Sequence, residues 1–300
     1  MKILVFSSLN IDHDYTVDHI CRPRESMFAD SYKVVPGGKG LNAAIALARS
    51  SVQVYLAGNI GNDAAILEKT LADNNVDIRY LHHVDEPNGH AIIQIDSTGE
   101  NAIFVYGGSN QSISRDHIDH VLESFGKGDL IILQNEISNN DYLMIKAHEK
   151  GLTIMMNPSP INDALFSCPL ELADYFFINE AEGTALTGKT DFPDILDQLK
   201  LRYPQAAVIL TVGARGSYYQ DSSCRLFQPA CQVNAVDTVG AGDTFMGYFA
   251  YGLSTGKSPA ECLKLATLAS AITVARKGAA DAIPTLWEVT ALENKLQKEV

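Results

Sequence analysis

Short apolar runs recur along the chain and alternate with segments whose apolar residues have helical spacing. The runs predict strands at residues 3–6, 52–57, 130–133, 153–156, 175–178 and 208–212. The intervening segments predict helices at residues 41–49, 64–74, 140–150, 180–186 and 194–202. This alternation is typical of a mostly parallel sheet with helices on both faces, so we expect a three-layer α/β/α fold. Ligands of such folds bind beyond the carboxyl ends of the strands.

Two segments interrupt this alternation. Residues 32–36 and 89–106 have the pattern of short antiparallel strands, and residues 97–100 supply turn formers between two alternating runs. We therefore expect a small β-sheet lid, formed by residues 11–36 and 90–109, over the carboxyl edge of the main sheet. The main domain would comprise residues 1–10, 37–89 and 110–300. A simple extension of one sheet edge is the alternative.

Composition narrows the class of protein. With 46% hydrophobic and 20% charged residues, the 300-residue chain can build a large core. The net charge of −13 and the absence of any Lys/Arg-rich run argue against nucleic acid as a partner. No apolar run reaches the ~20 residues of a membrane span. The first apolar stretch is too short for a secretory signal, because acidic Asp12 follows it. Five cysteines without a CxxC pair indicate reduced thiols, so we expect a cytoplasmic protein.

A glycine-rich turn precedes an apolar helix in the last third of the chain, in the stretch DTVGAGD that ends at Asp243. The first turn of a helix has unpaired N–H groups and a partial positive charge, which suit a phosphate group. Gly240 and Gly242 let this backbone approach a ligand closely. Asp243 could accept a proton from a hydroxyl held at the same turn, which predicts a phosphoryl-transfer centre. Helix capping alone is the other interpretation of Asp243.

A second glycine cluster, PGGKGLN, precedes the helix expected at residues 41–49. It matches neither the P-loop nor the dinucleotide-binding pattern, although its backbone is equally open. Lys39 and Asn42 add polar side chains to it. Asn10 and Asp12 follow the first strand, where their side chains could bind sugar hydroxyls or simply form a turn.

Together, GGKGxN early in the chain and DTxGAGD late in it resemble the two signatures of the ribokinase-like (PfkB) carbohydrate kinase family. The resemblance runs through nearly the whole chain. Segments that resemble the ribose-phosphorylating members lie at residues 9–13, 99–101, 108–110, 157–160, 179–182, 211–216 and 276–279. The resemblance implies a ribokinase-like α/β/α fold with a β lid. It also implies ATP-dependent phosphorylation of the primary hydroxyl of a small sugar, with D-ribose 5-phosphate as the expected product.

The resemblance further implies a role for each matching residue. Asp243 would be the general base, and the backbone of Gly240, Ala241 and Gly242 would form an anion hole. The sugar would be held by Asn10, Asp12, Gly38, Lys39, Gly40, Asn42 and Glu136. ATP would be bound by Asn179, Glu182, Thr211, Gly213, Arg215 and Gly216, with Glu182 holding Mg²⁺ through water. A monovalent cation, expected to be K⁺, would be bound by the backbone of Asp237, Val239 and Gly278.

Two residues depart from the family pattern. Ala282 stands where members of the family have a serine in the cation loop, so one oxygen of the expected K⁺ site is missing. Met246 stands where many members have asparagine, and its apolar side chain is expected to fill the core. Both changes leave the identity of the sugar open.

Other functions remain possible at this point. The acceptor could be fructose, a sugar phosphate or a nucleoside. Arg22 and Arg24 are the lid cations available for a phosphate, and the aromatic residues available for a base are Tyr15, Phe28, Tyr32 and Tyr106. A catalytically silent sensor could share the fold. A Rossmann dehydrogenase would need a glycine fingerprint after the first strand, where FSSLN stands instead. Exposed lid edges predict a homodimer formed through the lid.

Overall fold

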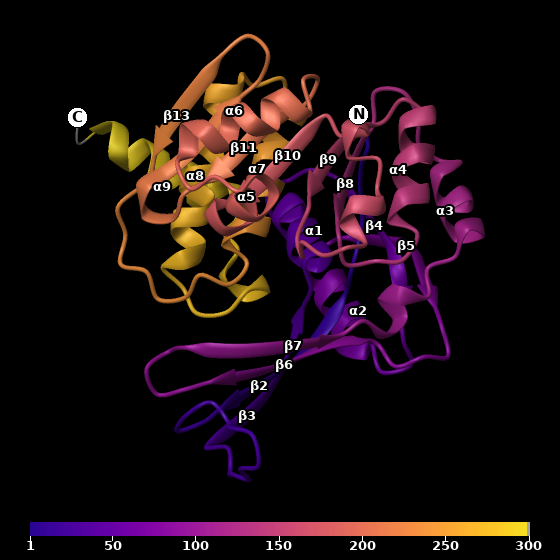
Figure 1. The fold of residues 1–300 in the computed structure, drawn as a ribbon, viewed down its shortest axis with the longest axis vertical. Helices are drawn as coiled ribbons and strands as arrows, with labels where there is room; N and C mark the ends of the chain where they lie inside the picture. Colours follow the sequence, from indigo (N-terminus) through magenta and orange to yellow (C-terminus); the bar gives the residue numbers. More distant parts are fainter. Residues whose placement is uncertain (299–300) are drawn as a thin grey trace.

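The computed structural model describes residues 1–298, which form two β-sheets with helices around the larger one (Figure 1). The strands of the larger sheet are β1 (Ile3–Phe6), β4 (Val54–Ile60), β5 (Asp77–His83), β8 (Leu130–Gln134), β9 (Thr153–Asn157), β10 (Tyr175–Asn179), β11 (Ala207–Thr211), β12 (Gly216–Gln220) and β13 (Arg225–Pro229). Their order is β13-β12-β11-β10-β9-β8-β1-β4-β5. Neighbours from β5 to β11 are parallel, and β12 and β13 form an antiparallel edge.

Helices cover both faces of this sheet. One face carries α1 (Lys39–Arg49), α2 (Ala65–Asp73), α7 (Ala241–Ser254), α8 (Pro259–Val274) and α9 (Leu286–Lys298). The opposite face carries α3 (Arg115–Leu122), α4 (Asn140–Glu149), α5 (Glu180–Thr187) and α6 (Phe192–Arg202). Both faces are covered because side chains alternate along each strand and both faces are apolar. In β1, Ile3 and Val5 pack into the core on the first face, and Leu4 and Phe6 pack into the core on the opposite face. The predicted three-layer, mostly parallel fold is confirmed.

The sequence prediction missed several elements at the margins of the fold, namely β5, β12, β13, α3, α8 and α9. The misses have physical reasons. Strand β5 is half-exposed and carries charged residues, so it has no continuous apolar run. Helix α8 is apolar on nearly all sides because it packs against α7, α9 and two strands, which hides the helical period.

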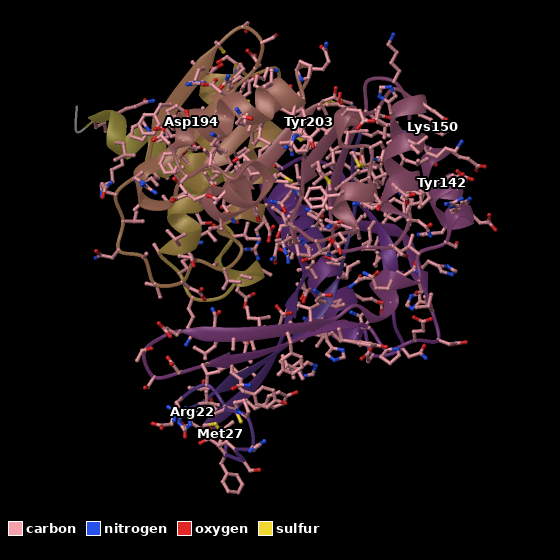
Figure 2. The ribbon with its side chains drawn as sticks, in the orientation of Figure 1. Arg22, Met27, Tyr142, Lys150, Asp194 and Tyr203 are labelled. Atoms are coloured by element: carbon pink, nitrogen blue, oxygen red, sulfur yellow. The ribbon has the colours of Figure 1, made fainter. Side chains whose placement is uncertain are left out.

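The smaller sheet contains β2 (Asn10–Thr16), β3 (Ser31–Gly37), β6 (Gly89–Ile95) and β7 (Asn101–Tyr106), in the order β3-β2-β6-β7. It forms its own sheet, so the alternative of a simple edge extension is wrong. We call it the lid sheet. It projects beneath the main body, with Arg22 and Met27 at its far end (Figure 2).

The pairing inside the lid sheet is mixed. The predicted hairpin is present, because β6 and β7 pair antiparallel and the Asp96 N–H donates to the Glu100 carbonyl over 3.0 Å. Strands β2 and β6, by contrast, are parallel rather than antiparallel. Both strands leave the main body in the same direction, so they pair in parallel. The division into a main domain and a separate lid domain at the expected boundaries stays a prediction.

Candidate active site

The two glycine clusters of the sequence meet at the N-terminal ends of α1 and α7. Gly38 precedes α1 with φ 94°, and Gly240 precedes α7 with φ 74°, conformations that favour glycine. The Asn42 side-chain amide donates a hydrogen bond of 2.9 Å to Oδ2 of Asp243. The two helices also pack closely, because a Cβ on Gly247 would lie 2.6 Å from the Cβ of Ala46. Two distant loops therefore meet at one site, the region around Asn42 and Asp243 that we call the cleft.

The turn before Asp243 offers free backbone donors to this cleft. Within residues 1–298, the N–H groups of Gly242 and Asp243 have no hydrogen-bond acceptor, whereas the Ala241 N–H donates to the Thr238 carbonyl over 3.3 Å. A Cβ on Gly242 would meet nothing within 4 Å, so its backbone faces open space. Free amides at a helix N-terminus are suited to a phosphate oxygen. Of the three predicted anion-hole residues, Ala241 has its amide already engaged.

Charged side chains surround the Asp243 carboxyl group. Burial raises the pKa of Asp243 to about 7, the Lys39 ammonium and the Asn42 hydrogen bond lower it, and the Glu136 and Glu182 carboxylates raise it. Lys39 forms an ion pair with Glu136. Burial lowers the pKa of Lys39, but the carboxylates of Glu136, Asp243 and Glu182 outweigh burial, so the pKa is raised and Lys39 stays charged. A carboxyl group that titrates near neutral pH is well matched to general-base catalysis.

We expect kcat/KM to fall as the pH drops below about 7. The proposed base works only when ionised, and the raised pKa of Asp243 means that it is largely protonated below that value in the free enzyme. Burial, followed by the charges of Asp14 and Glu136, also raises the pKa of Asp12 to about 7, so the fall should be steeper than that of a single ionisation. Steady-state rates across the neutral range test this. A kcat/KM that stays constant down to the ordinary pKa of aspartate would contradict it.

The sugar-side residues gather around the start of the lid sheet. The Asp12 carboxylate lies against Gly37, where a Cβ would be 2.0 Å from its Oδ2, so any side chain there would displace the carboxylate. Oδ1 of Asn10 accepts a hydrogen bond of 2.8 Å from the side chain of Asn110, a residue to which the sequence assigned no role. Gly40 is equally constrained, because a Cβ there would lie 2.6 Å from the Ser8 carbonyl oxygen.

Glu136 and Asn42 also lie in this region. Glu136 follows β8 and accepts a hydrogen bond from the Ser8 hydroxyl as well as pairing with Lys39. In the described part of the chain, Oδ1 of Asn42 is buried without a hydrogen-bond partner. Buried acceptors normally have a donor, so this oxygen is a candidate for binding a substrate hydroxyl. The predicted sugar residues thus lie in one region, and their individual roles stay predictions.

A cavity of about 590 Å³ opens beside the anion turn. Predicted residues in its wall are Asn179, Thr211, Gly213, Gly216, Ala241 and Gly242. Apolar wall residues that the sequence did not reveal are Cys231, Val233, Phe245, Ala271 and Val274. They come from α7, α8 and the segment after β13, and no motif marks them. The size and the largely apolar wall suit a nucleoside group next to phosphate-binding amides.

Two predicted nucleotide residues do not line this cavity. The Arg215 guanidinium pairs with Glu180 and lies 4.4 Å from the ring centroid of Phe192. Glu182 forms a capping box with Asn179, in which Oε2 accepts the Asn179 N–H over 2.9 Å. Burial raises the pKa of Glu182, and the hydrogen bond from the Asn179 backbone opposes that shift. Roles for Arg215 and Glu182 in ATP binding stay predictions.

The predicted cation loop is held together by Asp237. Its Oδ1 accepts the Val239 N–H over 3.1 Å and its Oδ2 accepts the Gly278 N–H over 3.0 Å. The carbonyl oxygens of Asp237, Val239 and Gly278 accept no hydrogen bond from any residue in the 1–298 range. Free carbonyls on adjacent segments fit a monovalent cation. Ala282 is 1% exposed and contributes no side-chain oxygen.

The described residues contain no group of three His, Cys, Asp or Glu side chains that could hold a metal ion. A bound Mg²⁺ would therefore take several of its ligands from phosphate oxygens and water. This arrangement is usual for Mg²⁺, which keeps several water ligands. Glu182 is the carboxylate proposed for such a role, and its Oε2 is already engaged by the Asn179 N–H. No helix in the same range has the length and apolarity that a bilayer span requires.

Comparison with known proteins identifies the family. The pfkB family carbohydrate kinase model matches residues 1–286. The chain belongs to this family. This carbohydrate kinase is 32% identical to a ribokinase of Bacillus subtilis over 299 residues, which covers 97% of the chain and 99% of the relative.

Solved structures agree with this assignment. A ribokinase of Thermotoga maritima superposes with a TM-score of 0.87 at 31% identity, covering 98% of this chain and 99% of that one. A ribokinase of Arabidopsis thaliana complexed with ribose and ATP gives 0.86 at 27% identity, covering 97% and 98%. The predictions of family, fold class and kinase activity are confirmed, and the dehydrogenase alternative is excluded.

Proposed function

We propose that this carbohydrate kinase transfers the γ-phosphoryl group of ATP to the primary hydroxyl of D-ribose and releases D-ribose 5-phosphate. The observation that carries the proposal is the shared cleft, in which the Asp243 carboxylate bonds Asn42 of the other glycine cluster beside free backbone amides. Relatives named ribokinase, which match almost the full length of the chain, support ribose as the sugar.

The residues divide the reaction between them. Asp243 takes the proton of the attacking hydroxyl, while the free N–H groups of Gly242 and Asp243 receive the oxygens of the transferring group. Lys39 supplies a fixed positive charge at the same place. Mg²⁺, when bound with ATP, neutralises phosphate charge. Phosphoryl transfer needs alignment and charge neutralisation more than covalent help, and this cleft provides both.

The charge of the cleft argues against a phosphorylated acceptor. The Asp12 carboxyl group lies within electrostatic reach of the Asp14 and Glu136 carboxylates, and Lys39 is already paired with Glu136. Lys33 and Lys277 act on Asp14, which compensates part of this negative charge. Arg22, one of two lid cations considered for a phosphate, lies at the far end of the lid sheet (Figure 2). A dianionic acceptor would therefore be repelled, and a neutral sugar is favoured.

The lid sheet also argues against a nucleoside acceptor. Side chains alternate along β2, so Asp12 faces the cleft and Tyr15 faces the other way. Tyr15 stacks on Tyr32 with ring centroids 4.8 Å apart, on that opposite face. Tyr15 and Tyr32, two of the aromatic residues available for a base, are thus turned away from the sugar site, which disfavours the nucleoside alternative.

A coupled ATP assay over an acceptor panel tests the function. The panel contains D-ribose, 2-deoxy-D-ribose, D-fructose, D-ribose 5-phosphate and ribonucleosides, each with Mg²⁺ and with or without K⁺. D-Ribose should give the highest kcat/KM, the product should carry the phosphate on its primary hydroxyl, and K⁺ should increase the rate. A higher kcat/KM for a nucleoside or a sugar phosphate would overturn the choice of acceptor.

We also propose that two chains associate through the lid sheet. Its face opposite Asp12 exposes Tyr32, Phe104 and Tyr106 by 51%, 59% and 52%, an apolar patch that a second copy would cover. Phe104→Lys should convert a dimer at micromolar concentration into a monomer, as measured by light scattering. Leu201→Lys, at a 77% exposed site on α6, should leave the dimer intact. A monomeric unmodified protein would contradict the proposal.

A cytoplasmic location is proposed on separate grounds. All five cysteines are free in the structure, including Cys21 on the surface of the lid sheet and Cys262 in the core. Unpaired thiols are typical of a reducing compartment, where ATP is also available.

A further inference from the structure

Arg49, the last residue of α1, holds the loop that follows α8. Its Nη1 donates to the carbonyl oxygen of Ala280 over 2.9 Å, to that of Ile283, and more weakly to that of Asp281 at 3.5 Å. Its Nε donates to Oδ1 of Asn74 over 2.7 Å. Arg49 is partly buried, so a single guanidinium group satisfies a cluster of carbonyls that bulk water reaches poorly.

Residues 280–283, which Arg49 contacts, make few other hydrogen bonds on their buried side. Ala280, Ala282 and Ile283 are 4%, 1% and 1% exposed, and the only internal backbone bond of the short helix η5 (Ala280–Ala282) in the described chain runs from the Ala282 N–H to the Ala279 carbonyl over 3.1 Å. On its C-terminal side, the Tyr248 hydroxyl donates to the Pro284 carbonyl over 2.8 Å. Loss of the guanidinium would therefore leave buried carbonyls without donors.

The same segment touches the anion turn and the proposed cation carbonyls. A Cβ on Gly240 would lie 3.3 Å from both Cα and Cβ of Ala279, so Ala279 lies directly against the turn. One residue earlier, Gly278 donates its N–H to Asp237. A shift of residues 278–283 would therefore move both the free carbonyls and the turn that carries Asp243.

Helix α1 connects the Arg49 contact to the sugar-side residues. Its first turn carries Lys39 and Asn42 of the sugar-side cluster, and its last residue is Arg49. The helix is rigid over its 11 residues, a length of roughly 16 Å. Arg49 thus ties the far end of the helix that carries the sugar-side cluster to the loop beside the phosphate site.

We propose that Arg49 is a positioning residue, which aligns residues 278–283 so that the monovalent-cation carbonyls and the anion turn keep their geometry. The inference rests on the proposed function. Ala282 supplies no hydroxyl to this loop, so the loop depends on the guanidinium rather than on a side chain of its own for its inner hydrogen bonds.

The test compares Arg49→Ala, Arg49→Lys and Arg202→Ala. Arg202 also donates to a backbone carbonyl, that of Leu186 at 3.1 Å, but on α6. Arg49→Ala should lower kcat by about 10-fold, because small misplacements of a phosphoryl-transfer site are costly. It should also raise the K⁺ concentration for half-maximal rate and leave the KM for D-ribose nearly unchanged. Arg49→Lys and added guanidinium should restore part of kcat, and Arg202→Ala should change none of these values.

A second readout does not depend on turnover. K⁺ added with ADP and Mg²⁺ should raise the Tm of the unmodified kinase, and this increase should shrink in Arg49→Ala. An Arg49→Ala protein that merely unfolds more easily, with an unchanged K⁺ response and kcat per folded molecule, would overturn the inference. An unmodified protein whose Tm ignores K⁺ would overturn it too. If the unmodified protein binds K⁺ but fails to phosphorylate D-ribose, the proposed acceptor is wrong and the Tm comparison still decides the role of Arg49.

Discussion

Asp243→Asn is expected to lower kcat for D-ribose by about 10³-fold, the range of general-base catalysis, while the Kd for ATP stays nearly constant. Asparagine keeps the size of the side chain and can still bond Asn42, but it cannot take the hydroxyl proton. The backbone amides of the anion turn and the nucleotide cavity remain in place. Single-turnover rates and calorimetric titration with a non-hydrolysable ATP analogue measure the two effects.

Stability provides a control for this variant. The pKa of Asp243 is raised in the folded state, so the protein loses stability as the pH rises from the ordinary pKa of aspartate to about 7, and the full cost is present above that pH. Asp243→Asn removes that cost, and the variant should be at least as stable as the unmodified kinase in mildly alkaline buffer. Asp197→Asn, which changes an exposed carboxylate on α6 that pairs with Arg225 of β13, should keep full activity. Near-normal turnover of Asp243→Asn would remove Asp243 from the mechanism.

Asp12→Asn is expected to raise the KM for D-ribose by about 10²-fold with a smaller change in kcat, because a hydrogen bond to a charged group contributes roughly 1.5–3 kcal/mol. The carboxylate accepts from two neighbouring sugar hydroxyls in the proposed complex, and an amide offers only one acceptor oxygen. Gly37 leaves the space that the side chain needs, so the variant should fold normally. Steady-state kinetics over a wide range of ribose concentrations separate KM from kcat.

The matched control is Asp18→Asn, which changes a carboxylate on the lid loop that is 85% exposed and contacts His19. It should leave both kinetic constants unchanged. If Asp12→Asn lowered kcat alone and left KM intact, Asp12 would have no direct contact with the ground-state sugar, and its assignment to sugar binding would be wrong.

Local patterns in the sequence were sufficient for most of the main domain. Predicted strand 175–178 is observed as Tyr175–Asn179, because a short apolar run rich in aromatic residues favours a buried strand. Predicted helix 41–49 is observed as Lys39–Arg49, because its apolar residues have helical spacing. The glycine turns before α1 and α7 were also recognisable, since a positive φ next to a helix start favours glycine.

The sequence was less informative where an element is buried on several sides or pairs with a distant partner. Nothing in the order of residues 10–16 and 89–95 distinguishes parallel from antiparallel pairing, which depends on how both strands leave the main body. The wall of the nucleotide cavity could not be predicted either. Phe245 and Val274 look like ordinary core residues in the sequence, and they line the cavity only because α7 and α8 pack together.

By itself, the sequence determined the layered α/β class, the hairpin of the lid sheet, the two glycine turns and the family. Only the tertiary structure decided that Asn42 bonds Asp243, that Lys39 pairs with Glu136, and that Arg49 clasps the loop beside the anion turn. The physical reason is the distance along the chain over which each kind of interaction acts. Periodicity and turn chemistry act over a few neighbouring residues, whereas a site assembled from α1, α7 and the ends of several strands depends on packing between segments that share no local pattern.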